Sequence, residues 1–139
     1  MSATPHQASC VSIAGRGLLI EGPPGSGKSS LALALIDRGA RLVGDDGVLL
    51  EVRDGRLWAL PPPNIAGLVE IRNVGLATFP AEAAPVALLV RLDPAAPRLP
   101  ESAERAMLAG VSVPLIRLFP GTPALPLRAE WALALHGTA

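Results

Sequence analysis

The segment EGPPGSGKSS, residues 21–30, contains the residue types that bind phosphate groups. Within it, GPPGSGKS matches the pattern G-x-x-x-x-G-K-[ST] of phosphate-binding loops. Glycines let such a loop curl so that several backbone N–H groups point at one phosphate, and the N-terminus of the following helix adds positive charge. The segment therefore predicts a nucleotide-phosphate site, with a chance match in a glycine-rich chain as the alternative. The residues predicted to bind the nucleotide are Gly22, Pro23, Pro24, Gly25, Ser26, Gly27, Lys28, Ser29 and Ser30.

Lys28 is the only lysine of the chain, and the other eleven basic side chains of the Lys/Arg type are arginines. Lysine is a slim, flexible point charge that reaches between phosphates, whereas the planar guanidinium of arginine is bulkier. The hydroxyl that follows it, on Ser29, is of the type that binds Mg²⁺ in such loops. We therefore predict that Lys28 holds the outer phosphates and that arginine does not replace it.

Two aspartates, Asp45 and Asp46, directly follow an apolar run that is typical of a short strand. Ligands of α/β sheets bind at the carboxyl ends of strands, where an aspartate can hold Mg²⁺ or accept a proton from an attacking hydroxyl. Asp-Asp-Gly is also favourable turn chemistry, which is the alternative. The phosphate loop favours the catalytic interpretation. Glu70 and Arg72 are the next candidates, and an ordinary solvated strand face is the alternative for them.

The elements around these residues are predicted from apolar runs and turn signals. Residues 11–20 indicate a β-hairpin with its turn at 15–17, and residues 48–60 indicate a second hairpin around Asp54-Gly55. No helix breaker occurs from residue 28 to residue 38, ahead of Gly39, so a helix is expected there. The order of strands and helices predicts an α/β core with β-hairpin additions, within a single domain spanning residues 1–139.

The second half of the chain is more often broken by proline. Apolar runs at 86–92 and 111–119 predict strands, the latter interrupted at Pro114, and either run could serve as core or as an interface between copies. The other expected elements are a loop at 61–68, a strand or active-site loop at 69–79, a connection at 93–105 with a short helix from Ser102, and an amphipathic helix at 126–136.

Composition excludes several classes of protein. The formal net charge is zero and aromatic residues make up 3% of the chain, which argues against nucleic-acid binding. No apolar run approaches the roughly 20 residues needed to cross a bilayer, and the first ten residues lack the features of a signal peptide. The one cysteine, Cys10, cannot form an internal disulfide. We therefore expect a cytoplasmic protein.

Three elements in order resemble the catalytic domain of the HPr kinase/phosphorylase family. They are the phosphate loop, the LVGDD strand end and the EIRNVG segment that starts at Glu70. The similarity covers about residues 6–76 and is greatest to short forms that consist of the catalytic domain alone, because residues 1–10 are too few to replace the separate N-terminal domain of longer members. The resemblance implies a P-loop-containing, PEP-carboxykinase-like α/β fold.

The resemblance also implies an activity and a role for each residue. The family uses ATP and Mg²⁺ to phosphorylate a serine of the phosphocarrier protein HPr, or a related phosphotransferase-system protein, and many members reverse this reaction by phosphorolysis. By position, Lys28 would be catalytic and Asp45 would be the general base. Ser29, Asp46 and Glu70 would serve the metal, and Asp46 and Arg72 would belong to the catalytic face. Family members are often hexameric, which implies a homo-oligomer.

Some positions depart from the family pattern and keep other functions open. The signature reads Arg72-Asn73-Val74-Gly75 where the family has Arg-Gly, and His6 lies one residue away from the position of the family's upstream histidine. Arg117 and Arg128 are candidates for the family's later basic segment. A P-loop kinase of small-molecule hydroxyls and a nucleotide-sensing module without turnover remain the alternatives.

Overall fold

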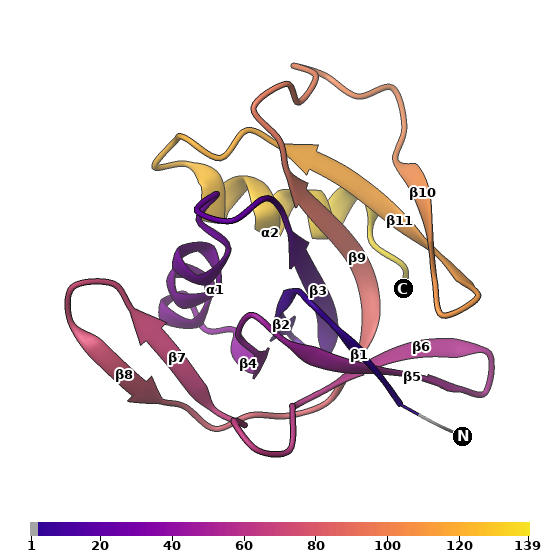
Figure 1. The fold of residues 1–139 in the computed structure, drawn as a ribbon. Helices are drawn as coiled ribbons and strands as arrows, with labels where there is room; N and C mark the ends of the chain where they lie inside the picture. Colours follow the sequence, from indigo (N-terminus) through magenta and orange to yellow (C-terminus); the bar gives the residue numbers. More distant parts are fainter. Residues whose placement is uncertain (1–2) are drawn as a thin grey trace.

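A computed structural model describes residues 3–139, in which eleven strands and two helices are present. Figure 1 shows both helices on one side of a curled sheet and the β7–β8 hairpin projecting beyond α1. The elements are β1 (Thr4–His6), β2 (Ser9–Ile13), β3 (Arg16–Glu21), α1 (Lys28–Asp37), β4 (Arg41–Gly44), β5 (Val48–Arg53), β6 (Arg56–Leu60), β7 (Leu68–Ile71), β8 (Gly75–Thr78), β9 (Ala84–Leu92), β10 (Glu104–Leu108), β11 (Val111–Leu118) and α2 (Leu125–His136).

The main sheet is organised around β9. Seven of its nine strands run in the order β1-β5-β6-β9-β3-β2-β4, and the other two, β11 and its partner β10, join the sheet at β9 through β11. The first residues of β9 pair with β6 in antiparallel fashion, and residues 89–92 pair with β11 in parallel. On its other side β9 is parallel to β3. The carboxyl ends of β3, β9 and β11 therefore lie at one edge of the sheet, where α/β proteins bind ligands.

Apolar side chains fill both faces of this sheet. Along β3, Leu18 and Ile20 face the cluster that contains both helices, whereas Leu19 faces a second cluster under the β5–β6 hairpin. The same alternation on β9 places Leu88 with the helices and Leu89 with the hairpin. Strands buried on both faces carry near-continuous apolar runs, which explains the runs at 86–92 and 111–119. Because most of these side chains are buried within the chain, the core interpretation is confirmed.

Several predicted elements are confirmed. The hairpins β2–β3 and β5–β6 form, although the first turns at Ala14-Gly15, where both residues have positive φ, rather than at 15–17. Helix α1 forms, and Gly39 follows it with a φ of 109°. Residues 61–67 form the predicted loop. The ambiguous segment 69–79 contributes to a separate two-stranded sheet, β7–β8.

The short helix predicted from Ser102 is wrong. Glu104–Leu108 instead forms β10, which pairs in antiparallel fashion with β11. Ala109 and Gly110 connect the two strands with φ values of 50° and 80°, the conformation of a tight hairpin turn. Pro114 does not interrupt β11, because the parallel pairing with β9 begins one residue later, at Leu115.

Two further features of the described residues concern the length of the helices and the single cysteine. Within residues 3–139, neither helix is long and apolar enough to cross a membrane. Cys10 is fully buried, and this burial raises the pKa of its thiol. A buried thiol with a raised pKa is a poor nucleophile, so Cys10 belongs to the core and not to a reactive site.

Candidate functional site

The phosphate loop connects β3 to α1, as its sequence predicts. β3 ends at Glu21 and α1 begins at Lys28, so that the loop amides and the helix N-terminus face the same space. Gly25 and Gly27 have φ values of 78° and 99°, which side chains other than glycine rarely adopt. The Nζ of Lys28 donates a hydrogen bond to the carbonyl oxygen of Gly22 at 3.0 Å, so the lysine lies back across the loop.

Gly22 is required by packing inside the loop. A Cβ at this position would lie 2.6 Å from the Oγ of Ser26 and 3.1 Å from the Cβ of Leu92. The Ser26 hydroxyl is itself buried without a hydrogen-bond partner. The start of the loop is therefore packed tightly against the end of β9. The first position of the motif must be glycine because a larger residue would overlap Ser26 and Leu92.

Asp45 lies beside the phosphate loop. Its Oδ1 accepts hydrogen bonds from the Ser29 hydroxyl at 2.6 Å and from the Ser9 hydroxyl at 3.1 Å. Its Oδ2 accepts a longer bond, 3.4 Å, from the backbone N–H of Glu70. The carboxylate therefore connects the loop, β2 and β7. These contacts bring Asp45 to the loop, and its catalytic role stays a prediction.

Ser9 is a site residue that the sequence reading missed. It is fully buried, and its hydroxyl both donates to Asp45 and accepts from the backbone N–H of Asp46 at 3.1 Å. It reaches them because β2 pairs with β4, whose carboxyl end carries the two aspartates. The sequence gives only a weak signal for it, because Ser9 is one of two serines in this short strand.

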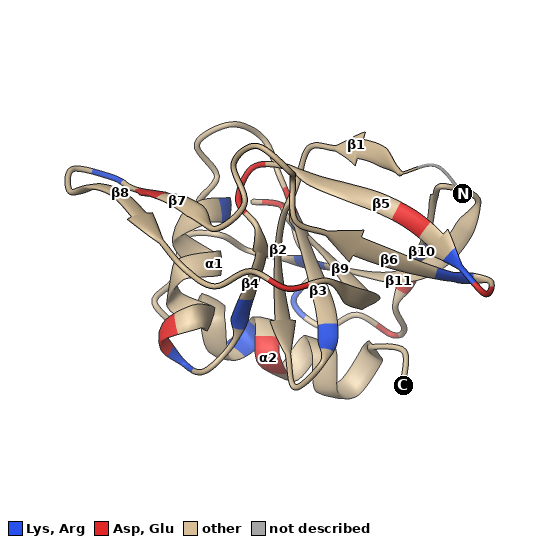
Figure 2. Ribbon diagram, turned by 90° about the horizontal axis from the view of Figure 1, so that it is seen from below, with Lys and Arg blue, Asp and Glu red and all other residues tan. Residues whose placement is uncertain are grey.

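A cavity of about 330 Å³ brings most of the predicted site residues together. It lies between the phosphate loop and the β7–β8 hairpin, and Figure 2 shows charged positions on that hairpin and acidic positions near α1. Asp46, with a φ of 58°, lines this cavity, as do Glu70 of β7 and Arg72 in the hairpin turn. The complete lining is Gln7, Pro24, Gly25, Gly27, Lys28, Ser29, Ser30, Asp46, Glu70 and Arg72.

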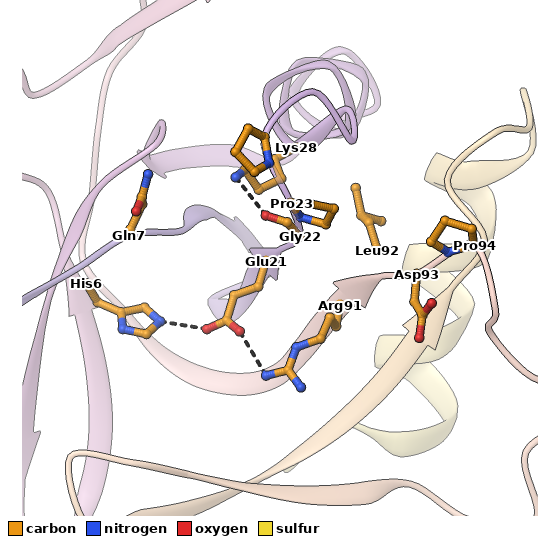
Figure 3. Close-up of a pocket in the computed structure, with 11 residues that line it drawn as sticks. His6, Gln7, Glu21, Gly22, Pro23, Lys28, Arg91, Leu92, Asp93 and Pro94 are labelled. Atoms are coloured by element: carbon orange, nitrogen blue, oxygen red, sulfur yellow. Dashed lines mark hydrogen bonds and ion pairs between the residues drawn. The ribbon is translucent and has the colours of Figure 1, made fainter.

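A second cavity, of about 680 Å³, opens on the β9 side of the loop. Figure 3 shows His6, Glu21 and Arg91 in a row along it. Glu21 Oε2 lies 2.6 Å from His6 Nε2, and Glu21 Oε1 accepts a hydrogen bond of 3.0 Å from Arg91 Nη2. The sequence reading gave no role to Glu21 or Arg91. The only signal in the sequence was one charged residue near the end of each of two apolar strands. In the structure these two residues are paired in the register of β3 and β9.

The donor atoms near Ser29 suit a magnesium nucleotide. Mg²⁺ prefers oxygen ligands and is usually bound by one or two carboxylates together with waters and substrate phosphates. The Ser29 hydroxyl and the carboxylates of Asp45, Asp46 and Glu70 supply such oxygens beside the loop. Within residues 3–139 no group of three or more His, Cys, Asp and Glu side chains forms a closed metal site.

Gly44 positions the aspartates, and we predict that Gly44→Ala is harmful. A Cβ at Gly44 would collide with the carbonyl oxygen of Gly47 and lie 2.8 Å from the Cγ1 of Val48. We expect a loss of about 1–3 kcal/mol in the free energy of unfolding, measured with urea, because backbone must move to relieve the overlap. Gly47→Ala is the matched control, since nothing lies within 4 Å of its added Cβ. Equal stabilities of the two variants would contradict the prediction.

Comparisons with known proteins identify the family of this chain. Residues 2–81 match the family model described as the HPr Serine kinase C-terminal domain. The chain belongs to this family. The matched region contains the phosphate loop, both aspartates, Glu70 and Arg72, whereas β9, β10, β11 and α2 lie beyond it.

Similar proteins include HPr kinase/phosphorylases and one solved structure. The HPr kinase/phosphorylase of Streptococcus thermophilus is 39% identical over 118 residues, covering 75% of this chain and 38% of that protein. That of Clostridium novyi is 45% identical over 71 residues, covering 51% and 23%. The structure of the Hpr(Ser) kinase/phosphatase from Coxiella burnetii matches with a TM-score of 0.82 at 30% identity, covering 94% of this chain and 88% of that chain. This chain therefore has the fold of the family's kinase domain and spans less than half the length of these curated relatives.

The candidates for a later basic segment lie elsewhere. Arg117 on β11 donates hydrogen bonds to Glu104 at 2.8 Å and to Asp93 at 3.2 Å. The hydrogen bond that it donates to Glu104, followed by the negative charge of Glu104, raises the pKa of Arg117. Arg128 is exposed on α2. Neither arginine lines either cavity, so the structure does not bring them to the site.

Proposed function

We propose that this chain is an ATP- and Mg²⁺-dependent protein-serine kinase that acts on HPr, or a related phosphocarrier protein, in the cytoplasm. The observation that carries the proposal is the 2.6 Å hydrogen bond between Ser29 of the phosphate loop and Asp45. In this proposal Asp45 is the proton acceptor, and its contact with Ser29 supports a position beside the terminal phosphate. The membership of the family supports the choice of a serine hydroxyl as acceptor. In this proposal residues 1–139 act as one catalytic domain, which assembles into a homo-oligomer.

The proposed roles follow from the contacts. Lys28 and the loop amides hold the β- and γ-phosphates, and Ser29, Asp46 and Glu70 serve the metal, which neutralises charge on the phosphates. The Oδ1 of Asp45 is occupied by two serine hydroxyls, whereas its Oδ2 meets only the N–H of Glu70. Oδ2 therefore accepts the proton of the substrate serine. At the same time the serine oxygen bonds to the γ-phosphorus, and the bond between the γ-phosphorus and the β–γ bridging oxygen breaks, which releases ADP. Arg72 would stabilise the transferring group.

The reverse direction uses the same residues in the opposite order. Inorganic phosphate would attack the phosphoserine phosphorus, the serine oxygen would leave with the proton from Asp45, and pyrophosphate would form. Both directions require a cation at the phosphates and a carboxyl at the serine, which Lys28 and Asp45 provide. We therefore include phosphorolysis in the proposal.

The test is transfer of label from γ-labelled ATP to HPr in the presence of Mg²⁺. We expect a phosphoserine on HPr, located by mass spectrometry, and no transfer to an HPr variant whose acceptor serine is alanine. Absence of transfer to any phosphocarrier protein at high enzyme concentration would overturn the proposed substrate. ADP release with a metabolite instead would identify a small-molecule kinase, and tight ATP binding without turnover would identify a nucleotide-sensing module.

A further inference from the structure

The two cavities meet at the phosphate loop. Gln7, Pro24 and Lys28 line both of them, so Lys28 stands at their junction. The smaller cavity extends toward the end of β4 and the β7–β8 hairpin, and the larger one extends toward the end of β9. A ligand bound across the loop therefore has two directions in which to extend.

The position of the carboxylates fixes which end of a nucleotide points in each direction. Asp46, Glu70 and the Ser29-bound Asp45 lie on the β4 side, so the γ-phosphate and the metal belong there. The three phosphates of a nucleoside triphosphate form a linear chain, and the nucleoside is attached at its other end. The nucleoside must then leave the loop away from the carboxylates, and the larger cavity is the space that opens at the loop on the β9 side.

The chemistry of the larger cavity suits an uncharged group. Glu21 is paired with Arg91 and His6, and Asp93 is paired with Arg117 at 3.2 Å, so these charges are compensated within the chain. A further phosphate or an acidic peptide would find no uncompensated cation beyond Lys28. Apolar walls come from Pro23, Leu92 and Pro94. Small-molecule sites are mostly apolar with a few polar groups and measure about 300–1,000 Å³, a range that includes this cavity.

We propose that the larger cavity binds the base and ribose of the donor nucleotide, with the His6–Glu21–Arg91 row as its polar wall. This inference rests on the proposed function in two respects, namely that the phosphate loop holds a nucleoside triphosphate and that the carboxylates mark the side of its γ-phosphate. Residues 91–94, which form one side of the cavity, lie beyond the region matched by the family model. Carboxylate oxygens with remaining lone pairs accept hydrogen bonds from ribose hydroxyls, which is the contact assigned to Glu21.

The test compares ATP with inorganic tripolyphosphate, which has the phosphates but no nucleoside. In Pro94→Trp, an exposed residue at the rim is replaced by a side chain that fills the cavity. We expect the Kd for Mg-ATP to rise about tenfold or more, since the nucleoside loses its site, while the Kd for tripolyphosphate changes less than about twofold. Isothermal titration calorimetry measures both. Pro97→Trp is the matched control, because Pro97 is exposed in the same loop and does not line the cavity.

The outcomes separate this inference from the proposed function. Unchanged ATP affinity in Pro94→Trp, or equal weakening of ATP and tripolyphosphate in a folded variant, would overturn the nucleoside site. Wild-type protein that binds neither ligand would overturn both proposals, whereas wild-type protein that binds ATP but never phosphorylates HPr would overturn the proposed function alone. If Pro94→Trp does not fold, photolabelling of the wild-type protein with an azidoadenine analogue of ATP replaces it. Label at residues 91–94 or at His6 supports the inference, and label at residues 70–76 contradicts it.

Discussion

Replacing Lys28 with arginine is expected to reduce the rate of phosphoryl transfer by about 100-fold or more, the usual loss when one charged or hydrogen-bonding group is removed from the transferring phosphoryl. The lysine lies across the loop with its Nζ 3.0 Å from the Gly22 carbonyl oxygen, so its charge is held close to the loop backbone. A planar guanidinium is longer and wider, and it cannot occupy this position without displacing the loop. The loop is closely packed at Gly22, since even a Cβ added there would lie 2.6 Å from the Oγ of Ser26 and 3.1 Å from the Cβ of Leu92. Single-turnover transfer to HPr measures the loss.

The control for this variant is an exchange of arginine and lysine at the surface. Arg41 lies 3.6 Å from Glu82 in an exposed ion pair, and such pairs contribute little to stability. Arg41→Lys is therefore expected to transfer phosphate at the wild-type rate. If Lys28→Arg also retained that rate, the slim shape of lysine would have no role, and the presence of a single lysine in the chain would lose its explanation.

The parts of the site that could be predicted from sequence are those encoded by local patterns. The loop motif, the following helix and the two aspartates at a strand end each depend on fewer than about ten consecutive residues. A position of Asp45 near the loop also follows from the sequence, because the two aspartates end an apolar run typical of a strand and ligands of α/β sheets bind at the carboxyl ends of strands. The structure confirms that proximity through the 2.6 Å hydrogen bond between Ser29 and Asp45.

The missed residues depend on pairings between distant segments. Ser9 reaches Asp45 because β2 lies between β3 and β4, an order that the turn signals do not reveal. Glu21 meets Arg91 because β3 and β9 are parallel and in a register that aligns these two residues. A local pattern shows that a charge occurs in an apolar strand, but only the register shows which charge compensates it.

The wrong helix at Ser102 has a related cause. The segment ESAERAML has good helix formers, which favour a helix when packing is not known. The edge of β11 offers a continuous partner instead, and the Ala109-Gly110 turn returns the chain along that edge. Tertiary pairing therefore overrode local propensity. The β7–β8 hairpin is a second case in which the local pattern did not determine the structure, since a strand and a loop were both possible there. Its two strands form a sheet of their own, which carries Glu70 and leads into Arg72.

Asp45→Asn is expected to lower the rate of transfer by about 100- to 10,000-fold while nucleotide affinity stays close to wild type, because a general base is lost and the shape of the side chain is kept. The amide can still bond to Ser9 and Ser29, whose hydroxyls rotate to accept as well as donate, and its oxygen can still accept from the N–H of Glu70. An amide has almost no basicity, so the proton of the substrate serine has no acceptor. Transfer rates and calorimetric binding of Mg-ATP separate the two effects.

Two companion variants decide whether the loss belongs to Asp45 as the base. Asp54 lies in the β5–β6 turn at a φ of 51°, a conformation that asparagine tolerates well. Asp54→Asn makes the same change from carboxylate to amide, and it is expected to leave both the transfer rate and Mg-ATP binding unchanged. Asp46→Asn is expected to weaken Mg-ATP binding, because Asp46 lines the cavity on the metal side of the loop. If Asp46→Asn instead kept normal binding and lost transfer, while Asp45→Asn weakened binding, the two roles would be exchanged: the Ser29-bound carboxylate would support the metal, and the cavity-lining one would take the proton.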